Sequence, residues 1–220
     1  MDLEISGRKA IICNVESHLA LACADALGSE GVSVLLGGSH RAMSDIAIRG
    51  MREGGSRQIT VVQENATTEE TLNSLLRECA EPDIVILGDA RRLRLLDLVC
   101  NVVPGMRSRG FGRILTIDST GIGGQIDEEV TGPMHDTVSQ RELARDNVTI
   151  NSIIAGRFSN GRREASGEAA KRLAISIPAG RLGKPQEIGA TCAFLCGQAA
   201  GSVTGMSLLV DGGDSLRTFA

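Results

Sequence analysis

Short apolar runs rich in β-branched residues alternate along the chain with longer segments in which apolar residues recur every three to four positions. The short runs predict strands and the longer segments predict helices between them. The expected strands are 10–13, 32–36, 60–63, 83–87, 113–117, 148–154 and 207–210. Regular strand–helix alternation predicts one doubly wound α/β domain over residues 1–220, with about seven parallel strands and helices on both faces.

Two of the predicted helices carry specific signals. A helix over 186–195 is predicted to bury Ile188, Cys192 and Leu195 on one face, because these residues are spaced as neighbouring helical turns require. A second helix, over 67–79, begins at a threonine followed three residues later by a glutamate, which is the signature of a capping box. We find no internal repeat, no low-complexity segment and no linker.

Composition narrows the range of functions. The 220 residues are 42% hydrophobic and 23% charged, which is ordinary for a globular domain, and the net charge of −4 gives no case for a nucleic-acid or membrane surface. The densest basic cluster is Arg91, Arg92 and Arg94, interpreted as a solvated helix start, with a site for an anionic ligand as the alternative. Aromatic content is 2%, with neither Tyr nor Trp, so the core must be aliphatic.

The cysteines and the termini add two expectations. None of the six cysteines forms a C-x-x-C pair, and most lie in apolar runs, which predicts small buried thiols and no metal site. The chain shows no signal peptide and no run of 18 apolar residues, so we expect a cytoplasmic protein.

The C-terminal third carries a specific pattern, "NVTINSIIAGRFSN" followed by "IPAGRLGKPQEIGATCAFLCGQAAGSVTGMSLLVDGG". This pattern resembles the short-chain dehydrogenase/reductase family. The segment "VVPGMRSRGFGRILTIDST" is similar to the family's helix and the strand that ends at its catalytic serine. The resemblance covers nearly the whole chain and implies a Rossmann-like fold. It also implies NAD(P)-dependent hydride transfer between the cofactor and a hydroxyl or carbonyl group.

The family's cofactor turn, T-G-x-x-x-G-x-G, falls on residues 13–20, where its three glycine positions hold Asn14, His18 and Ala20. Glycine serves there because the backbone must approach the pyrophosphate without a Cβ in the way. The His18 ring and the Glu16 charge both oppose a bound phosphate. We therefore expect no cofactor on this chain, and we expect Glu16 or Ser17 to cap the following helix instead, with a cofactor site of unusual form as the alternative.

Other cofactor motifs of the family are also missing. Residues 37–39 are Gly-Gly-Ser, so no acidic or basic side chain selects the adenosine ribose. The family's N-N-A-G falls on Leu87-Gly88-Asp89-Ala90 and has lost both asparagines. The proline that precedes Gly156 in the family is Ala155. The chain is also shorter than the family pattern in the fourth-helix and catalytic-helix regions.

Of the catalytic Ser, Tyr and Lys that the family uses, only Ser119 has a counterpart. The chain contains no Tyr, and its three lysines lie at 9, 171 and 184, away from the expected helix. Ser119 is therefore interpreted as vestigial, and no catalytic residue is assigned. His135 or Asp136 would be the replacement acid or base, although a solvated helix face is the favoured interpretation of His135.

Because the losses fall on the chemistry and spare the sheet core, we hypothesise a non-catalytic subunit. It would join an active family member, which carries NAD(P), in a hetero-oligomer, most simply a heterotetramer. The family offers a precedent in a hydroxyacyl-CoA dehydrogenase of anaerobic toluene breakdown, which resembles such a pairing. The resemblance implies interfaces at the last helix and strand, with Phe194, Leu195, Leu208 and Val210 as candidates, part of which must instead be core, and at the helix around 99–106.

Three alternatives stay open from the sequence. The chain could be an oxidoreductase with a rebuilt site that uses Ser119 and an unrecognised acid. It could be a sensor that binds a metabolite in the vacated cofactor cleft. It could also be a homo-oligomer with a structural role.

Overall fold

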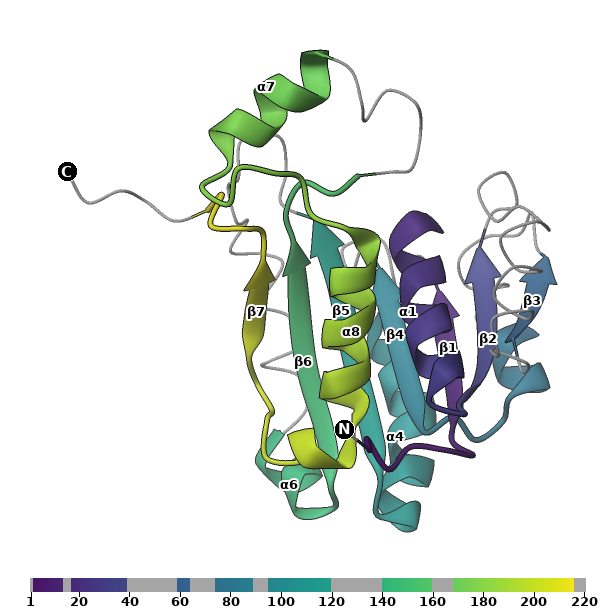
Figure 1. The fold of residues 1–220 in the computed structure, drawn as a ribbon. Coiled ribbons are helices and arrows are strands. Elements are labelled where there is room, and N and C mark those ends of the chain that lie inside the picture. The colour runs from purple at the N-terminus through teal and green to yellow at the C-terminus, as the bar shows by residue number, and fades with distance from the viewer. Residues whose placement is uncertain are drawn as a thin grey trace.

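The computed structural model describes residues 2–13, 17–38, 59–63, 74–88, 95–119, 140–159 and 168–215. It confirms a single Rossmann-like α/β domain. Seven parallel strands form one sheet in the order β3-β2-β1-β4-β5-β6-β7 (Figure 1). All six pairings are parallel, so the carboxyl ends of all seven strands lie at the same edge of the sheet.

The strands are β1 (Lys9–Cys13), β2 (Ser33–Gly38), β3 (Ile59–Gln63), β4 (Ile84–Gly88), β5 (Gly112–Ser119), β6 (Val148–Ala155) and β7 (Ser207–Val210). Each lies within two residues of its predicted bounds. The helices are α1 (Ser17–Ser29), α4 (Leu95–Arg109), α6 (Gln140–Arg145), α7 (Glu168–Ser176) and α8 (Pro185–Cys196), followed by the 3₁₀ turn η2 (Gln198–Ala200). Residues 74–78 are also helical, as predicted for the end of the 67–79 helix, whose capping box lies outside the described residues.

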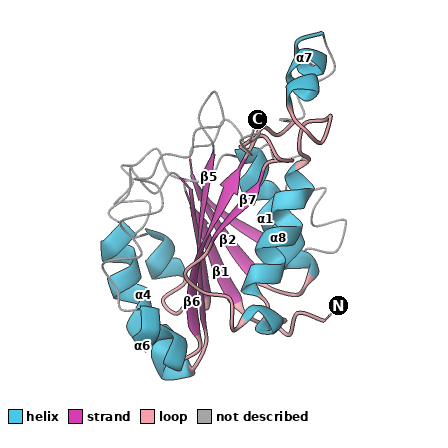
Figure 2. Ribbon diagram, turned by 90° about the vertical axis from the view of Figure 1, so that its left-hand side faces the viewer, coloured by secondary structure: helices cyan, strands magenta, loops and turns pink. Residues whose placement is uncertain are grey.

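Helices cover both faces of the sheet, α1 and α8 on one side and α4 and α6 on the other (Figure 2). The core is aliphatic, as the composition requires, with a larger cluster under α1 and α8 and a smaller one under α4 and α6. The two helices of the first layer pack very closely. A Cβ on Gly189 of α8 would lie 2.9 Å from the carbonyl carbon of Ala22 and closer still to its oxygen.

Helix α8 confirms its predicted register, because Ile188, Cys192 and Leu195 are all buried. Its start is fixed by Glu187, whose carboxylate accepts a bond from the Lys184 backbone N–H at 2.7 Å and another from the Arg181 guanidinium at 2.6 Å. The hydrogen bonds from Arg181 and Lys184 lower the pKa of Glu187 to about 2. These bonds fix the start of the helix, which packs against α1 and over β5 and β6.

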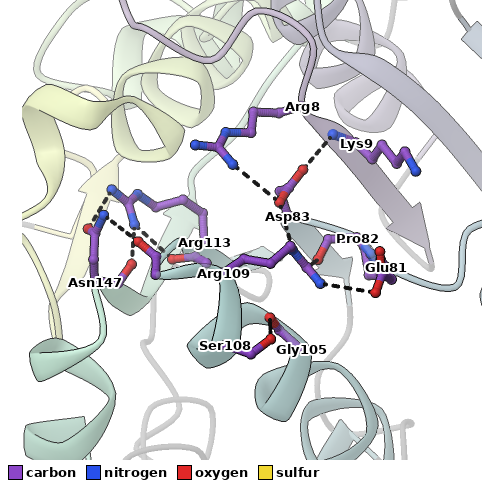
Figure 3. A network of polar contacts seen from close by, with 12 residues as sticks. Arg8, Lys9, Glu81, Pro82, Asp83, Gly105, Ser108, Arg109, Arg113 and Asn147 are labelled. Atoms are coloured by element: carbon purple, nitrogen blue, oxygen red, sulfur yellow. Dashed lines mark hydrogen bonds and ion pairs between the residues drawn. The ribbon is translucent and has the colours of Figure 1, made fainter.

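The amino edge of the sheet is held by a charged network centred on Asp83 (Figure 3). Its carboxylate accepts bonds from the Lys9 backbone N–H at 3.1 Å, from Arg109 Nε at 3.3 Å and from Arg8 Nη1 at 3.5 Å. These partners belong to β1, to the end of α4 and to the residue before β1. The network therefore ties β1 and β4 to the α4 layer, at the edge opposite the strand ends that form ligand sites in such folds.

Arg113 lies fully buried beside this network, at the start of β5. Its Nη1 donates to the carbonyl oxygens of Gly112 and Asn147, each at 2.8 Å, and its Nη2 donates to Asn147 Oδ1 at 3.1 Å. The Phe111 ring packs against it, with the centroid 4.2 Å from Arg113 Cζ and 4.0 Å from Arg8 Cζ. One cation–π contact and three oxygens thus stabilise the Arg113 guanidinium, which burial would otherwise destabilise.

Of the thiols described, Cys13, Cys23, Cys192 and Cys196 are buried and Cys79 is half-buried, as expected for small core residues. Within the described ranges, no group of His, Cys, Asp and Glu side chains could hold a metal ion. None of the described helices is both long enough and apolar enough to cross a membrane.

Candidate functional site

The strand order reverses direction between β1 and β4, which makes the carboxyl ends of these strands the topological switch point of the sheet. Ligands of open parallel sheets bind outside the strand ends at this point. The residues that end β1, β4 and β6 here include Cys13, Leu87 and Ala155, and all three are buried. The ends of β1, β4 and β6 therefore give the candidate site an apolar floor.

Cys13 is the only one of these three with a titratable side chain, and it stays neutral. Burial raises the pKa of the Cys13 thiol to about 12, from an ordinary value of 9.0. A thiol of this pKa has almost no thiolate at neutral pH, and the thiolate is the nucleophile and metal ligand. Cys13 therefore belongs to the apolar core under α4 and α6, and its thiol is protonated at neutral pH.

The titration of Cys13 gives a direct test. Because the folded pKa lies above the unfolded one, the folded chain keeps a proton that the unfolded chain loses above pH 9. We expect the contribution of Cys13 to stability to be complete below pH 9 and to fall by about 1.4 kcal/mol per pH unit towards pH 12. Thiolate absorbance at 240 nm is readable because the chain has no Tyr and no Trp. A thiolate absorbance that appears below pH 10 in the wild-type minus Cys13→Val difference spectrum of the folded chain would contradict this assignment.

The end of β2 is filled from one face by a leucine. A Cβ on Gly37 would lie 2.5 Å from Leu75 Cδ1 and 3.1 Å from both Leu75 Cγ and Cδ2. Leu75 belongs to the helical residues 74–78 and is fully buried. Glycine at this strand end is thus explained by packing, since any side chain at 37 would displace Leu75.

Adding a carboxylate at this position should therefore cost stability. We expect Gly37→Asp to lower the free energy of unfolding by about 2 kcal/mol, because the new side chain overpacks against Leu75. Urea denaturation measures this change. In the Gly37→Asp/Leu75→Ala double variant, we expect the cost to be smaller than the sum of the two single costs, because the truncation removes the clash. Additive costs would show that Leu75 is not the group that excludes a side chain.

The strand ends of β6 and β7 are tied to each other. The Gly156 N–H donates to the Val210 carbonyl at 3.0 Å, and a Cβ on Gly156 would lie 2.5 Å from Asp211 Cβ. Burial opposes the ionisation of Asp211, but hydrogen bonds from Ser215 and Gly213 outweigh it and lower the Asp211 pKa. Arg157 then pairs with Asp214 through two bonds, that from Nε measuring 2.8 Å. The segment after β6 is therefore fixed against the turn after β7.

The decisive comparison covers this same half of the molecule. A family model described as enoyl-(acyl carrier protein) reductase matches residues 95–215, more than half of the chain. The chain belongs to the short-chain dehydrogenase/reductase family.

Relatives extend the match to nearly the full chain. The subunit BbsC of (2S)-[(R)-hydroxy(phenyl)methyl]succinyl-CoA dehydrogenase from Thauera aromatica is 27% identical, covering 96% of this chain and 95% of the relative. The 3-oxoacyl-[acyl-carrier-protein] reductase FabG from Vibrio harveyi is 26% identical, covering 96% and 98%. The crystal structure of L-sorbose reductase from Gluconobacter frateurii complexed with NADPH and L-sorbose matches with a TM-score of 0.76 at 21% identity, over 99% of this chain and 100% of that one, which supports the shared fold.

In this dehydrogenase/reductase chain, the cofactor-turn residues Asn14 and Glu16 lie outside the described residues. His18 is half-buried in the first turn of α1, and Ala20 is 1% exposed in the helix. Helix α1 begins at Ser17, so its expected cap also falls outside the description. The same holds for Arg91, Arg92, Arg94, His135 and Asp136.

The carboxyl end of β5 holds a residue that sequence reasoning missed. Ser119 is the last residue of the strand, and its side chain lies outside the description. Asp118, one residue earlier, is a buried carboxylate with 5% exposure. No motif marks Asp118. The only signal in the sequence is a carboxylate directly after the predicted strand 113–117, and buried carboxylates are costly and common at functional sites.

The four interface candidates divide between the core and the surface. Leu195 is 1% exposed and belongs to the core of its own chain, as the sequence analysis expected for part of this set. Leu208 and Val210 are half-buried against the same core, whereas Phe194 is 42% exposed. Among the described residues, four further large apolar side chains are exposed and were not among the candidates: Leu173 and Ile175 on α7, Met206 just before β7 and Leu209 within it.

Proposed function

We propose that this chain is a non-catalytic subunit that joins an active NAD(P)-dependent dehydrogenase of its own family through α8 and β7. The active partner carries the cofactor and the catalytic Tyr and Lys. This chain stabilises the partner and shapes its substrate site. A hydroxyacyl-CoA is the substrate class we favour for the complex.

Exposed apolar side chains around the β7 end of the sheet carry the proposal. We call this region the α8–β7 flank and define it by Phe194 on α8, Met206 before β7 and Leu209 on β7, which lie on both faces of the sheet and are all exposed. No residue from 188 to 210 is charged, in a chain that is 23% charged overall. Depletion of charge together with exposed aromatic and methionine side chains is typical of the buried centre of a protein interface.

The edge of the sheet supports the same surface. β7 is the last strand of the sheet, so one row of its backbone N–H and C=O groups has no neighbouring strand in the described fold. Exposed strand edges pair readily with another chain. Leu208 and Val210 face the chain's own core while Leu209 points the other way, so apolar side chains surround this free edge.

Two residues of the described structure and one feature of the composition support the loss of chemistry in this chain. Leu75 occupies the space next to Gly37, where the family selects the ribose. Ala20 stands at a glycine position of the phosphate turn and is buried in α1. No Tyr exists anywhere in the chain to exchange the substrate proton.

The comparisons support the complex and its substrate class. BbsC, which matches this chain over nearly its whole length, is a subunit of a dehydrogenase that acts on a succinyl-CoA derivative. FabG is a reductase of acyl-carrier-protein thioesters. A thioester substrate for the complex is therefore consistent with both relatives.

The test has two parts. Fluorescence titration of the isolated chain with NADH and with NADPH is expected to give dissociation constants weaker than about 1 mM, that is, less than about 4 kcal/mol of binding. Native mass spectrometry of the tagged chain, purified from its own host at natural expression, is expected to show a second chain with intact T-G-x-x-x-G-x-G and Y-x-x-x-K motifs. A chain recovered alone, or only with copies of itself, contradicts the proposal.

One observation favours a second candidate function, an oxidoreductase with a rebuilt site. The buried carboxylate of Asp118 lies next to Ser119 at the strand end where the family places its catalytic serine. An oxidoreductase with a rebuilt site would use this pair. Micromolar cofactor binding by the isolated chain, lost in Asp118→Asn, would favour this candidate over the subunit.

A further inference from the structure

Cysteines from opposite ends of the chain meet where α1 packs against α8. Cys23 lies on α1, and Cys192 and Cys196 lie on α8. All three side chains are fully buried and belong to the larger core cluster. The Cys192 thiol makes hydrogen bonds with both Cys23 and Cys196. The fold therefore gathers three oxidisable groups, and the proposed function uses none of them.

The backbones of the two helices approach each other closely beside these thiols. Among the described helices, α1 and α8 make the most extensive contact with each other, and they lie side by side over one face of the sheet (Figure 2). A Cβ on Gly189 would clash with the carbonyl group of Ala22, the residue before Cys23. Side chains on a helix lean towards its amino terminus, so Cys192 leans towards the turn that holds Gly189. The two backbones are thus closest near the Cys23–Cys192 contact.

Of the two thiols that Cys192 contacts, only Cys23 can bond to it without unwinding a helix. Cβ atoms four residues apart on a helix, as in Cys192 and Cys196, are about 5–6 Å apart. A disulfide needs a Cβ–Cβ distance of about 3.5–4.5 Å. A bond between Cys192 and Cys196 would therefore disrupt the last turn of α8. A bond from Cys192 to Cys23 joins two helices and leaves the hydrogen bonds of each intact.

The surroundings of Cys192 set the conditions for its oxidation. Hydrogen bonds with Cys196 and Cys23, together with burial, raise the pKa of the Cys192 thiol well above its ordinary value of 9.0. The thiolate is the reactive form, so the closed fold reacts slowly at neutral pH. Mildly alkaline solution, or a local opening of α8 away from α1, increases the rate. The site therefore fits slow oxidation under sustained stress.

We propose that Cys23 and Cys192 form a redox site, which a hydroperoxide oxidises to a disulfide that joins α1 to α8. One thiolate attacks the hydroperoxide and takes up an oxygen as a sulfenic acid, while the O–O bond breaks and the other oxygen leaves, with a proton, as an alcohol or as water. The second thiol then attacks the sulfenic sulfur, the S–S bond forms and water leaves. The two cysteines lose two electrons and two protons, and the hydroperoxide is reduced. This site is independent of the proposed function.

The test is oxidation of the full chain with hydrogen peroxide at mildly alkaline pH, followed by intact mass spectrometry and by peptide mapping without reduction. The chain is expected to lose two hydrogen atoms and to give one cross-linked peptide that contains Cys23 and Cys192. The oxidised chain should unfold at a higher urea concentration, because the bond closes a long loop in the unfolded state. A dithiol reductant should reverse both changes.

Two matched variants separate the members of the cluster. Cys192→Ala is expected to abolish the disulfide, and Cys196→Ala is expected to keep it. Both remove a fully buried thiol from α8, and circular dichroism shows whether each variant is folded. If either fails to fold, the peptide map of the wild-type chain alone decides. A disulfide between any other pair of cysteines, oxidation to sulfinic or sulfonic acids without a disulfide, or no reaction of the wild-type chain would overturn the proposal.

Discussion

Replacing Phe194 by glutamate is expected to weaken the binding of the partner chain by at least about 100-fold, or roughly 3 kcal/mol, because the substitution buries an unpaired carboxylate in an apolar contact. Phe194 is 42% exposed in the single chain, so the same substitution should change the free energy of unfolding of the isolated chain by less than about 0.5 kcal/mol. Analytical ultracentrifugation of the complex and urea denaturation of the single chain measure the two effects.

The companion variant is Phe194→Leu, which keeps an apolar side chain at the same position. It should retain binding to within about tenfold, since it removes only part of the buried area. If glutamate and leucine weaken the complex equally, the ring itself makes a specific contact. If neither changes binding, Phe194 lies outside the interface and the α8–β7 flank is wrongly placed.

Gly189→Val is expected to destabilise the chain by about 3 kcal/mol or more, because α1 and α8 approach each other too closely for any side chain at this position. The nearest atoms to a Cβ on Gly189 are the backbone carbonyl carbon and oxygen of Ala22. Backbone atoms in a helix cannot rotate aside, so the two helices must separate and lose packing in the larger core cluster. Denaturant unfolding followed by circular dichroism measures the loss.

Gly105→Ala in α4 is the matched control, because it also adds a Cβ to a helical glycine. Its nearest neighbour is Arg109 Nη1 at 3.0 Å, the far end of a flexible side chain that can move at little cost. Alanine also favours the helix over glycine by about 1 kcal/mol. We expect Gly105→Ala to be neutral or stabilising by up to about 1 kcal/mol. Equal effects of Gly189→Ala and Gly105→Ala would show that the contact with Ala22 is not limiting.

The central strands could be predicted from sequence because they are buried on both faces and are therefore short runs of aliphatic residues. β4 and β6 are buried along their whole length, and β7 was placed at its exact bounds. The buried face of α8 followed from helical spacing alone. These features depend on local pattern, and local pattern is present in a single sequence.

What the sequence could not supply was the neighbour of each side chain. Leu195 and Phe194 are adjacent and both apolar, yet one packs in the core and the other faces outward, because α8 turns by about 100° per residue. From the sequence, Gly37 was interpreted only as the loss of a side chain that selects the ribose. The structure shows that Leu75 fills the space that a side chain at position 37 would need. Asp118 was passed over because no motif marks it, and only its burial makes it notable.

The uncharged segment from 188 to 210 also governs how long this chain can persist by itself. Newly synthesised copies that have met no partner display an unpaired strand edge beside exposed apolar side chains, the features that lead to self-association and to capture by chaperones and proteases. Copies made in excess of the partner should therefore be degraded. The cellular amount of this chain would then follow that of the active subunit, even when the two are synthesised at different rates.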